Sequence, residues 1–467
     1  MANIIDNFKE IKSSNLFFLI ETKDCLEKLK FLNLEKSIID KIFLSLKKKE
    51  NDFLQFFLGK KDFENLYVII YIDKNKRNIY ELLGEHVTKL PNKFTLLSNN
   101  NVNLLPMVDS CFLSRYKFQK YLSEKKEDEI NIYCENDYRQ KLESRIETID
   151  NIILARDLGE TPTSDLYPES FADIIKNTKW KKTKVTVLSP KDIEKKGLGL
   201  LWAVGKGSIN KPYMVILERI VDKKLPTIGF VGKGIVFDTG GINLKPEEWL
   251  YAMKDDMCGA ATVFATMKDL DKKDLNVNII ACIPIAENSI GGAAYRPSDI
   301  VKSYSGKTVN ITNTDAEGRL ILADAVSYIS KNYKLDKVIT IATLTGVALF
   351  ALGYRYAGIM GDDRIMLDNL LNYSKENFEK YFELPFDKYY IEKTKSLIAD
   401  FDNWTAGIYT GSTMGGAFIY NFLLNKEKFT HIDIAGVANN RFEPYGLYPK
   451  STTGFGVDSL SNLFTNM

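Results

Sequence analysis

The feature that constrains the fold most is a ten-residue run, Asn276–Ile285, which is apolar at nearly every position (NVNIIACIPI). A strand with one solvated face alternates apolar and polar residues, whereas a continuous apolar run is typical of a strand covered on both faces. Shorter segments of strand character lie before and after it: Lys184–Leu188, Met214–Glu218, Thr227–Val231 and Lys337–Thr343. We therefore expect an α/β fold with a mixed or mostly parallel sheet, in which sites form beyond the carboxyl ends of the strands.

A long helical pattern divides the chain. Apolar residues recur at helical spacing from Asn136 to Leu158, and Gly159 ends the pattern. Before it, a helical segment (Cys25–Lys48) and a β-rich run (Leu66–Ile72) indicate a small α/β fold without a chemical motif. The predicted organisation is a small N-terminal α/β domain (1–135), a connecting helix (136–160) and a larger C-terminal α/β/α domain with a mixed central sheet (161–467).

Composition limits the possible partners. The 467 residues are 45% apolar and 27% charged, an ordinary globular balance that excludes a disordered chain. The 63 basic and 61 acidic residues leave a net charge of +2, which provides no general field for nucleic acid or an anionic membrane. The uncharged stretches Val338–Gly353 and Asn403–Asn425 are respectively too short and too polar to span a bilayer. We expect a soluble protein, with nucleic acid an unlikely partner.

Histidine and cysteine usage excludes several kinds of site. The chain has two histidines, His86 and His431, so a HExxH or three-histidine zinc site is absent. Carboxylates and lysines must therefore carry any metal or acid–base chemistry. The five cysteines include no CxxC pair, which argues against a disulfide framework and favours a reducing cytoplasm.

Three segments combine glycine with carboxylates or lysine: VGKGIVFDTGGINLKP (Val231–Pro246), MKDDMCGAA (Met253–Ala261) and NTDAEGRLILAD (Asn313–Asp324). A fourth segment, TLTG (Thr343–Gly346), is expected to be a loop that leaves a buried strand. None matches a Walker or dinucleotide-binding pattern. In an extended segment Asp315 and Glu317 would point to one face, and two crowded carboxylates need a cation or a shared proton between them.

Asp238 and Asp256 bring the number of candidate carboxylates to four, enough for a pair of divalent cations. Oxygen-rich ligation suits Mn²⁺ or Mg²⁺ and tolerates Zn²⁺. A lysine beside such a site can ligate only as the neutral amine. Two-metal sites also serve phosphatases and nucleases, so an enzyme of phosphate chemistry is an alternative reading.

The glycine-rich segment, MKDDMCGAA and NTDAEGRLILADA resemble the signature of the leucyl aminopeptidases, cytosolic peptidases with a dinuclear metal centre. The similarity extends from Leu200 (LLWAVGKGS) to His431 (HIDIAGVA), and NTDAEGRL is highly specific. The first domain carries no comparable signature.

The resemblance implies two divalent ions per subunit, Mn²⁺ or Zn²⁺ with Mg²⁺ as an alternative. It assigns Asp238 and Glu317 as bridging ligands. Lys233 and Asp256 would complete one metal site, and Asp315 the other. Like the family, the chain would be a homohexamer of two stacked trimers that hydrolyses the N-terminal residue of peptides.

The resemblance also implies the catalytic groups. Lys245 would be the catalytic lysine, which binds the substrate carbonyl and the tetrahedral intermediate. Arg319 would hold a bicarbonate ion that acts as general base. Backbone amides around three residues would help to bind this ion: Ala316, Gly318 and Leu344.

The substrate pocket has three candidate residues. Met253, Thr343 and Gly346 could line a pocket that accepts leucine or another apolar first residue, although each residue taken alone is more typical of plain core packing. Asp255 would border this pocket if its segment is extended. A helical segment would turn it into solvent, which is the reading we favour. A separate set has expected structural roles: Cys258 and Cys282 as buried apolar residues, His431 as a hydrogen-bonding residue, and Asp324 as a support for backbone groups or a lysine.

Overall fold

The computed structural model describes residues 3–5, 11, 15–20, 32–48, 52–58, 63–71, 78–97, 104–134 and 138–467. The chain forms two compact units, Met1–Asp150 with Arg441–Ser451 and Asn151–Asn440 with Thr452–Met467. The long predicted helix is present as α5 (Arg139–Glu160), and the division between the units falls within it. Cys25 and the predicted boundary at residues 135 and 136 lie outside the described residues.

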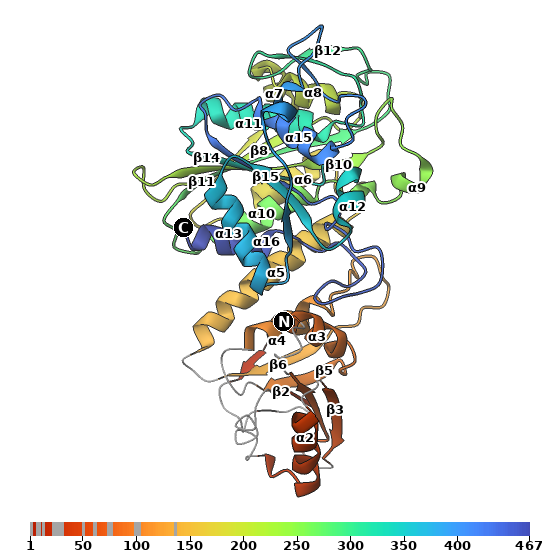
Figure 1. The fold of residues 1–467 in the computed structure, drawn as a ribbon, viewed down its shortest axis with the longest axis vertical. Helices are drawn as coiled ribbons and strands as arrows, with labels where there is room; N and C mark the ends of the chain where they lie inside the picture. Colours follow the sequence, from red (N-terminus) through yellow and green to blue (C-terminus); the bar gives the residue numbers. More distant parts are fainter. Residues whose placement is uncertain are drawn as a thin grey trace. The chain divides into compact units, whose positions relative to one another are not determined.

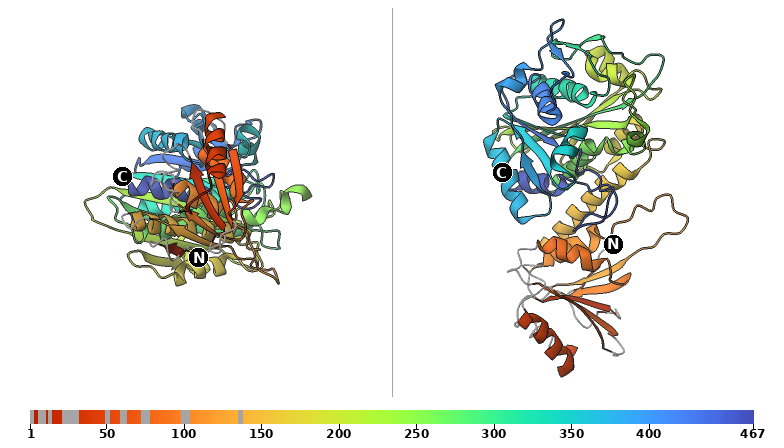
Figure 2. Two further views of the ribbon diagram at one scale, coloured as in Figure 1. Left: turned by 90° about the horizontal axis from the view of Figure 1, so that it is seen from below. Right: turned by 45° about the vertical axis from the view of Figure 1, so that its right-hand side comes forward.

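The first unit contains a six-stranded sheet in the described part of the chain. Its strands, in spatial order, are β1 (Asn3–Ile5), β6 (Glu129–Tyr133), β5 (Lys93–Leu97), β2 (Asn15–Ile20), β4 (Asn65–Ile70) and β3 (Asp52–Phe57). All neighbours are parallel except β3 and β4. The helices of this unit are α2 (Lys36–Lys48), α3 (Ile79–Val87) and α4 (Leu104–Leu113). Figure 2 shows α2, in red, beside the strands. The predicted small α/β fold is confirmed.

The second unit is built on a mixed nine-stranded sheet. Its spatial order is β16 (Tyr381–Glu383), β15 (Ala357–Gly361), β18 (Lys428–Asp433), β14 (Lys337–Ala342), β9 (Thr227–Gly232), β11 (Asn278–Asn288), β8 (Tyr213–Arg219) and β7 (Lys184–Leu188), with β10 (Gly234–Asp238) paired to β11. The four central strands β18, β14, β9 and β11 are mutually parallel, whereas β15, β8 and β7 run antiparallel to their inner neighbours. This confirms the predicted mixed central sheet.

Helices cover both faces of this sheet (Figure 1). One layer contains α8 (Gly199–Gly205), α11 (Gly318–Asn332) and α15 (Gly411–Tyr420). The other contains α6 (Pro168–Asn177), α10 (Cys258–Leu270), α13 (Arg364–Glu376) and α16 (Val457–Thr465). Strand β11 is buried at ten of its eleven residues, as a strand between two helical layers must be. The apolar run in the sequence therefore marks the centre of an α/β/α sandwich.

Shorter elements complete the second unit. They are α7 (Pro190–Lys196), α9 (Glu247–Leu250), a 3₁₀ turn (Met253–Asp255), α12 (Gly346–Leu352), α14 (Lys388–Glu392), and a small sheet of β12 (Ile300–Lys302), β13 (Thr308–Asn310) and β17 (Phe401–Asp402). The uncharged stretch Asn403–Asn425 is a loop followed by the buried helix α15, as predicted. In the described residues we find no helix with the length and hydropathy needed to cross a membrane.

Candidate active site

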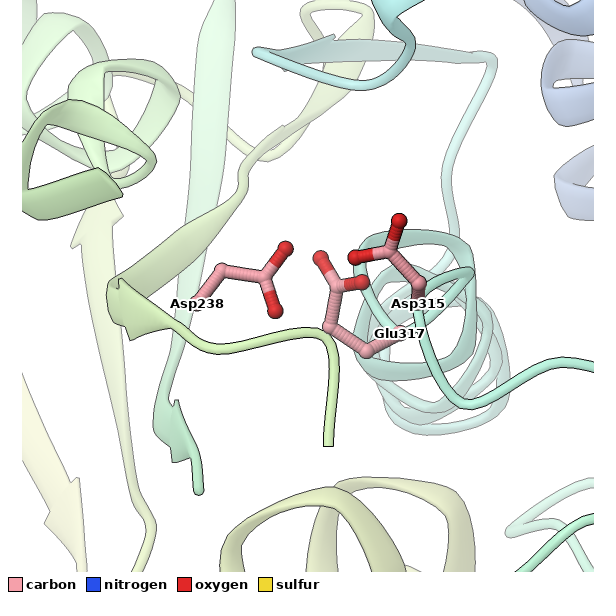
Figure 3. A group of neighbouring side chains, drawn as sticks. All are labelled: Asp238, Asp315 and Glu317. Carbon is pink, nitrogen blue, oxygen red and sulfur yellow. The ribbon is translucent and has the colours of Figure 1, made fainter. Parts of the chain in front are cut away.

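Three carboxylates converge at the carboxyl end of the large sheet. Asp238 is the last residue of β10, Asp315 lies in a turn, and Glu317 directly precedes α11. One oxygen of each lies within 4.8 Å of an oxygen of the other two, and Figure 3 shows the three groups facing one space. Asp315 lies in a turn that is closed by Ala316 N donating to Asn313 O at 3.3 Å, so the extended conformation considered from the sequence is not the one observed. The two side chains meet because the turn leads straight into the helix.

Two lysines lie among these carboxylates. Lys233 connects β9 to β10, and its Nζ is 2.8 Å from both Asp256 and Glu317. Lys245 Nζ lies 2.8 Å from Asp238 and also pairs with Asp315. Asp256 is outside the cluster of three and is joined to it through Lys233. When all four carboxylates are ionised, the two ammonium groups leave a charge of −2.

The electrostatics of the cluster follow from this shortage of positive charge. Burial lowers the pKa of Lys233, but the surrounding carboxylates outweigh burial and raise this pKa above its ordinary value. The pKa of Lys245 is raised against burial in the same way. Burial and then the neighbouring carboxylates Asp238 and Glu317 raise the pKa of Asp315 to about 7. Burial also raises the pKa of Asp256 well above its usual range. Crowded oxygen donors that resist ionisation fit divalent cations, which would stabilise the ionised form.

The loop after β14 supports Asp256. The Thr343 hydroxyl lies 2.8 Å from Asp256 Oδ1, and the Thr343 carbonyl accepts a hydrogen bond from Lys233 Nζ at 2.9 Å. The side chain of this pocket candidate is thus directed at a carboxylate. Gly346, another candidate, is exposed, and an added Cβ would meet no atom within 4 Å. Met253 is partly buried.

Asp255 is not the solvated residue that we expected. It ends a 3₁₀ turn and is only 4% exposed, and Asn439 Nδ2 donates to its Oδ2 at 2.9 Å. The expectation that a helical segment would turn Asp255 into solvent is therefore wrong. The turn directs this side chain inward, where Asn439 supplies a donor that offsets part of the cost of burial.

Arg319 lies in the first turn of α11, next to the carboxylates. Its Nη1 donates to the carbonyl of Asn403 at 2.9 Å, and its buried Nε has no hydrogen-bond partner among the described residues. Burial lowers the pKa of Arg319 to about 10, so the guanidinium is still charged at neutral pH. A buried charged donor without an acceptor, at the start of a 15-residue helix, fits a small anion.

The three amides expected to assist an anion differ in their surroundings. The Leu344 amide donates to Asp433 Oδ1 at 3.2 Å, and the Ala316 amide closes the turn described above. Among the described residues none accepts a hydrogen bond from the amide of Gly318, which is typical of a first helical turn.

Sequence reasoning did not find several supporting residues. Asn288, the last residue of β11, donates through Nδ2 to Asp238 Oδ1 at 2.7 Å and to Thr314 O at 3.1 Å. Two further residues come from distant parts of the chain. Asn403 donates through Nδ2 to Ala316 O, and Asp433 accepts through Oδ1 from the Leu344 amide. A polar residue at the carboxyl end of a buried apolar strand is a signal that could have identified Asn288.

The residues that were expected to have structural roles lie in the core and contact backbone groups or other core residues. Asp324 accepts backbone hydrogen bonds from Leu200, Leu201 and Tyr304, so it supports backbone groups. His431 Nδ1 lies 2.7 Å from the Thr340 hydroxyl in the core. Cys258 and Cys282 are buried, as expected.

Comparison with protein families decides where this arrangement belongs. Residues 153–461 match the model of the cytosol aminopeptidase family, catalytic domain. The chain belongs to the cytosol aminopeptidase family. This confirms the resemblance read from the motifs, and the match begins inside α5, after Asp150, where the N-terminal segment of the first unit ends.

Individual relatives agree with the family. The chain is 40% identical over 328 residues to "Probable cytosol aminopeptidase 1" of Shewanella oneidensis, a match that covers 70% of this chain and 65% of that protein. It is 38% identical over 366 residues to "Probable cytosol aminopeptidase" of Wolbachia pipientis, covering 76% and 73%. The matched part spans 61–65% of the length of three relatives: the Shewanella oneidensis protein and the probable cytosol aminopeptidases of Corynebacterium glutamicum and Corynebacterium diphtheriae.

Two solved structures share the architecture over nearly the whole chain. The bottromycin maturation enzyme BotP in complex with Mn superposes with a TM-score of 0.83 at 25% identity, covering 97% of this chain and 99% of BotP. The leucine aminopeptidase of Caenorhabditis elegans also superposes with a TM-score of 0.83, at 24% identity, and covers 100% of this chain and 98% of that protein.

Proposed function

We propose that this member of the cytosol aminopeptidase family is a metal-dependent aminopeptidase, which hydrolyses the N-terminal residue from peptides. The observation that carries the proposal is the convergence of Asp238, Asp315 and Glu317 on one space, with too little positive charge from the chain itself to balance them. Family membership and the manganese named for the similar BotP structure support the same reading.

The proposed ligand set is the one that the resemblance implies, and the contacts support it. Lys233 and Asp256, 2.8 Å apart, would help to hold one ion, and Asp315 the other. Asp238 and Glu317 would contribute to both, since they share a cluster with Asp315 and Glu317 also pairs with Lys233. When bound, the two ions, Mn²⁺ or Zn²⁺ with Mg²⁺ as an alternative, would activate water and polarise the substrate carbonyl. Lys233 must lose its proton to act as a ligand.

Lys245 would act on the reacting carbonyl. Its ammonium reaches Asp238 and Asp315, so it lies where the carbonyl oxygen of a bound peptide would meet the carboxylate cluster. A hydrogen bond from Lys245 would strengthen as negative charge develops on that oxygen.

Arg319 would bind a bicarbonate ion, and this ion would act as the general base. The site contains no histidine to move protons, since His431 is in the core beside Thr340. The unpartnered Nε of Arg319 and the amide of Gly318 are available donors. The Ala316 and Leu344 amides have protein acceptors, so they would contribute less.

For the substrate we propose a broad range with a preference for leucine or another apolar first residue. Met253 and the open space beside Gly346 would form the pocket, whereas the side chain of Thr343 would support Asp256, which its hydroxyl contacts. Apolar pockets discriminate weakly, by roughly 1–3 kcal/mol per methylene.

We also propose a cytoplasmic homohexamer. Light scattering should give a mass near six times 53.2 kDa. A fully active monomer at micromolar concentration would refute the hexamer without affecting the proposed chemistry.

Metal removal tests the proposal directly. Excess EDTA should abolish hydrolysis of leucyl p-nitroanilide, and Mn²⁺ or Zn²⁺ should restore it. Asp315→Ala and Glu317→Ala should lose one or both ions in elemental analysis while the circular dichroism spectrum stays unchanged. Full activity in a chelated protein that contains no metal would refute the proposal.

A further inference from the structure

Asn403 is a fully buried residue that contacts the carboxylate turn from a distant part of the chain. It directly follows β17, which pairs with β13, and its backbone N donates to Asn310 O at 3.1 Å. This pairing places its side chain against residues 312–316, which lead to the site.

The side-chain amide of Asn403 is used on both ends. Oδ1 accepts hydrogen bonds from the backbone N of Thr312 at 2.8 Å and of Asn313 at 3.2 Å. Nδ2 donates to the backbone O of Asn313 at 2.6 Å and of Ala316 at 3.2 Å. Two amide donors on one side and two carbonyl acceptors on the other match only a carboxamide. A carboxylate here would set an oxygen against two carbonyl oxygens.

The backbone of the same residue reaches the guanidinium. Arg319 Nη1 donates to the Asn403 carbonyl at 2.9 Å, which is the bond that fixes one end of this buried side chain. Asn403 thus contacts both the turn that carries Asp315 and the arginine of the proposed anion site, although 84 residues separate it from Arg319.

We propose that Asn403 is a positioning residue for the aminopeptidase reaction: its amide sets the turn before Glu317, and its carbonyl sets Arg319. The inference rests on the proposed roles of these site residues. Asn403 touches no reacting atom, and it acts by keeping Asp315 and Arg319 in register with each other.

The test is Asn403→Asp, which keeps the size and the acceptor but replaces the donor by a charge. At saturating Mn²⁺, kcat for leucyl p-nitroanilide should fall about 100-fold, the scale of an ångström-level misplacement, while KM stays within about threefold. Mn²⁺ affinity measured by calorimetry should weaken about tenfold.

Asp402→Asn is the matched control. Asp402 accepts from Asn310 Nδ2 at 2.7 Å in the same strand pair, and among the described residues no hydrogen bond joins it to a residue of the site. Its kcat and Mn²⁺ affinity should equal those of the wild type.

Thr312→Val is the milder second variant, because it removes a hydroxyl that lies 3.1 Å from Asn403 Oδ1 and also contacts the backbone N and O of the next residue, Trp404. It should fold and lower kcat about fivefold, since these contacts hold the same segment against the turn. Wild-type kcat and Mn²⁺ affinity in Asn403→Asp would overturn the inference. If that variant does not fold, an unchanged Thr312→Val would overturn it. An inactive wild type would refute the proposed function alone, and the Mn²⁺ affinities of the variants would still test the position of the carboxylates.

Discussion

Replacing Thr343 by Val removes one hydroxyl next to the proposed metal ligand Asp256 and leaves the volume of the side chain almost unchanged. In the structure this hydroxyl lies 2.8 Å from Asp256 Oδ1 in a buried setting, where Asp256 is 5% exposed. A hydrogen bond to a charged group contributes about 1.5–3 kcal/mol. Its loss should weaken Mn²⁺ binding at the site of Lys233 and Asp256 by roughly 10- to 150-fold.

The assay is a titration of the metal-free protein with Mn²⁺, in which binding is measured by calorimetry and by the recovery of peptidase activity. Thr343→Val should need more Mn²⁺ but reach nearly the wild-type kcat at saturation, because Asp256 is still present. Thr345→Val is the matched control. It lies two residues further along the same loop, and its hydroxyl faces Asp433 at 2.8 Å, away from Asp256. The control should leave Mn²⁺ affinity unchanged.

A different result would refute this reasoning. If Thr343→Val kept its Mn²⁺ affinity but changed the ratio of kcat/KM between leucyl and alanyl substrates, Thr343 would be a pocket residue and not a support for Asp256. Equal losses of Mn²⁺ affinity in both variants would indicate a general disturbance of the loop.

Three further outcomes are expected. Lys245→Ala should keep both ions and lower kcat by roughly 10²–10³. Arg319→Ala should lower kcat less, and added bicarbonate should partly restore it. A larger fall in kcat for Arg319→Ala than for Lys245→Ala would show that Arg319 contributes more to the reaction than Lys245. Asp255→Asn should leave the Lys-to-Leu ratio of kcat/KM unchanged and lower Tm, because Asp255 is buried; a tenfold drop in the ratio would place it in the substrate pocket. Gly318→Ala should release the ion that Lys233 is proposed to hold, because the added Cβ would lie 2.5 Å from Lys233 Cε; normal metal content in elemental analysis would contradict this.

Much of the fold could be predicted because it depends on local patterns. The run at Asn276–Ile285 became the central strand β11, and Lys184–Leu188 is β7 with the same bounds. Helix α11 begins at Gly318, directly after the carboxylates, where an unbroken helical pattern in the sequence begins. The division into domains at residues 135 and 160 stays a prediction.

The types of residue in the site could also be predicted, since four carboxylates and two lysines in glycine-rich segments leave few chemistries without histidine. The sequence did not predict their pairing. Lys233 meets Glu317 across 84 residues, and Lys245 meets Asp315 across 70, because parallel strands bring the ends of distant segments to one edge of the sheet. No local pattern predicted the turn that carries Asp315, or the hydrogen bonds that Asn403 makes with the backbone of Asn313 and Ala316 in that turn.

By itself, the sequence determined the α/β class, the central buried strand and the family motif, because hydrophobic periodicity and residue chemistry are properties of short segments. The tertiary structure alone decided the environment of each charge. It buried Asp255 against Asn439 and turned the Thr343 hydroxyl to Asp256. It also left Arg319 Nε without an acceptor among the described residues. These outcomes depend on contacts between segments more than 80 residues apart, and a side chain's burial and partners are fixed only when those segments pack together.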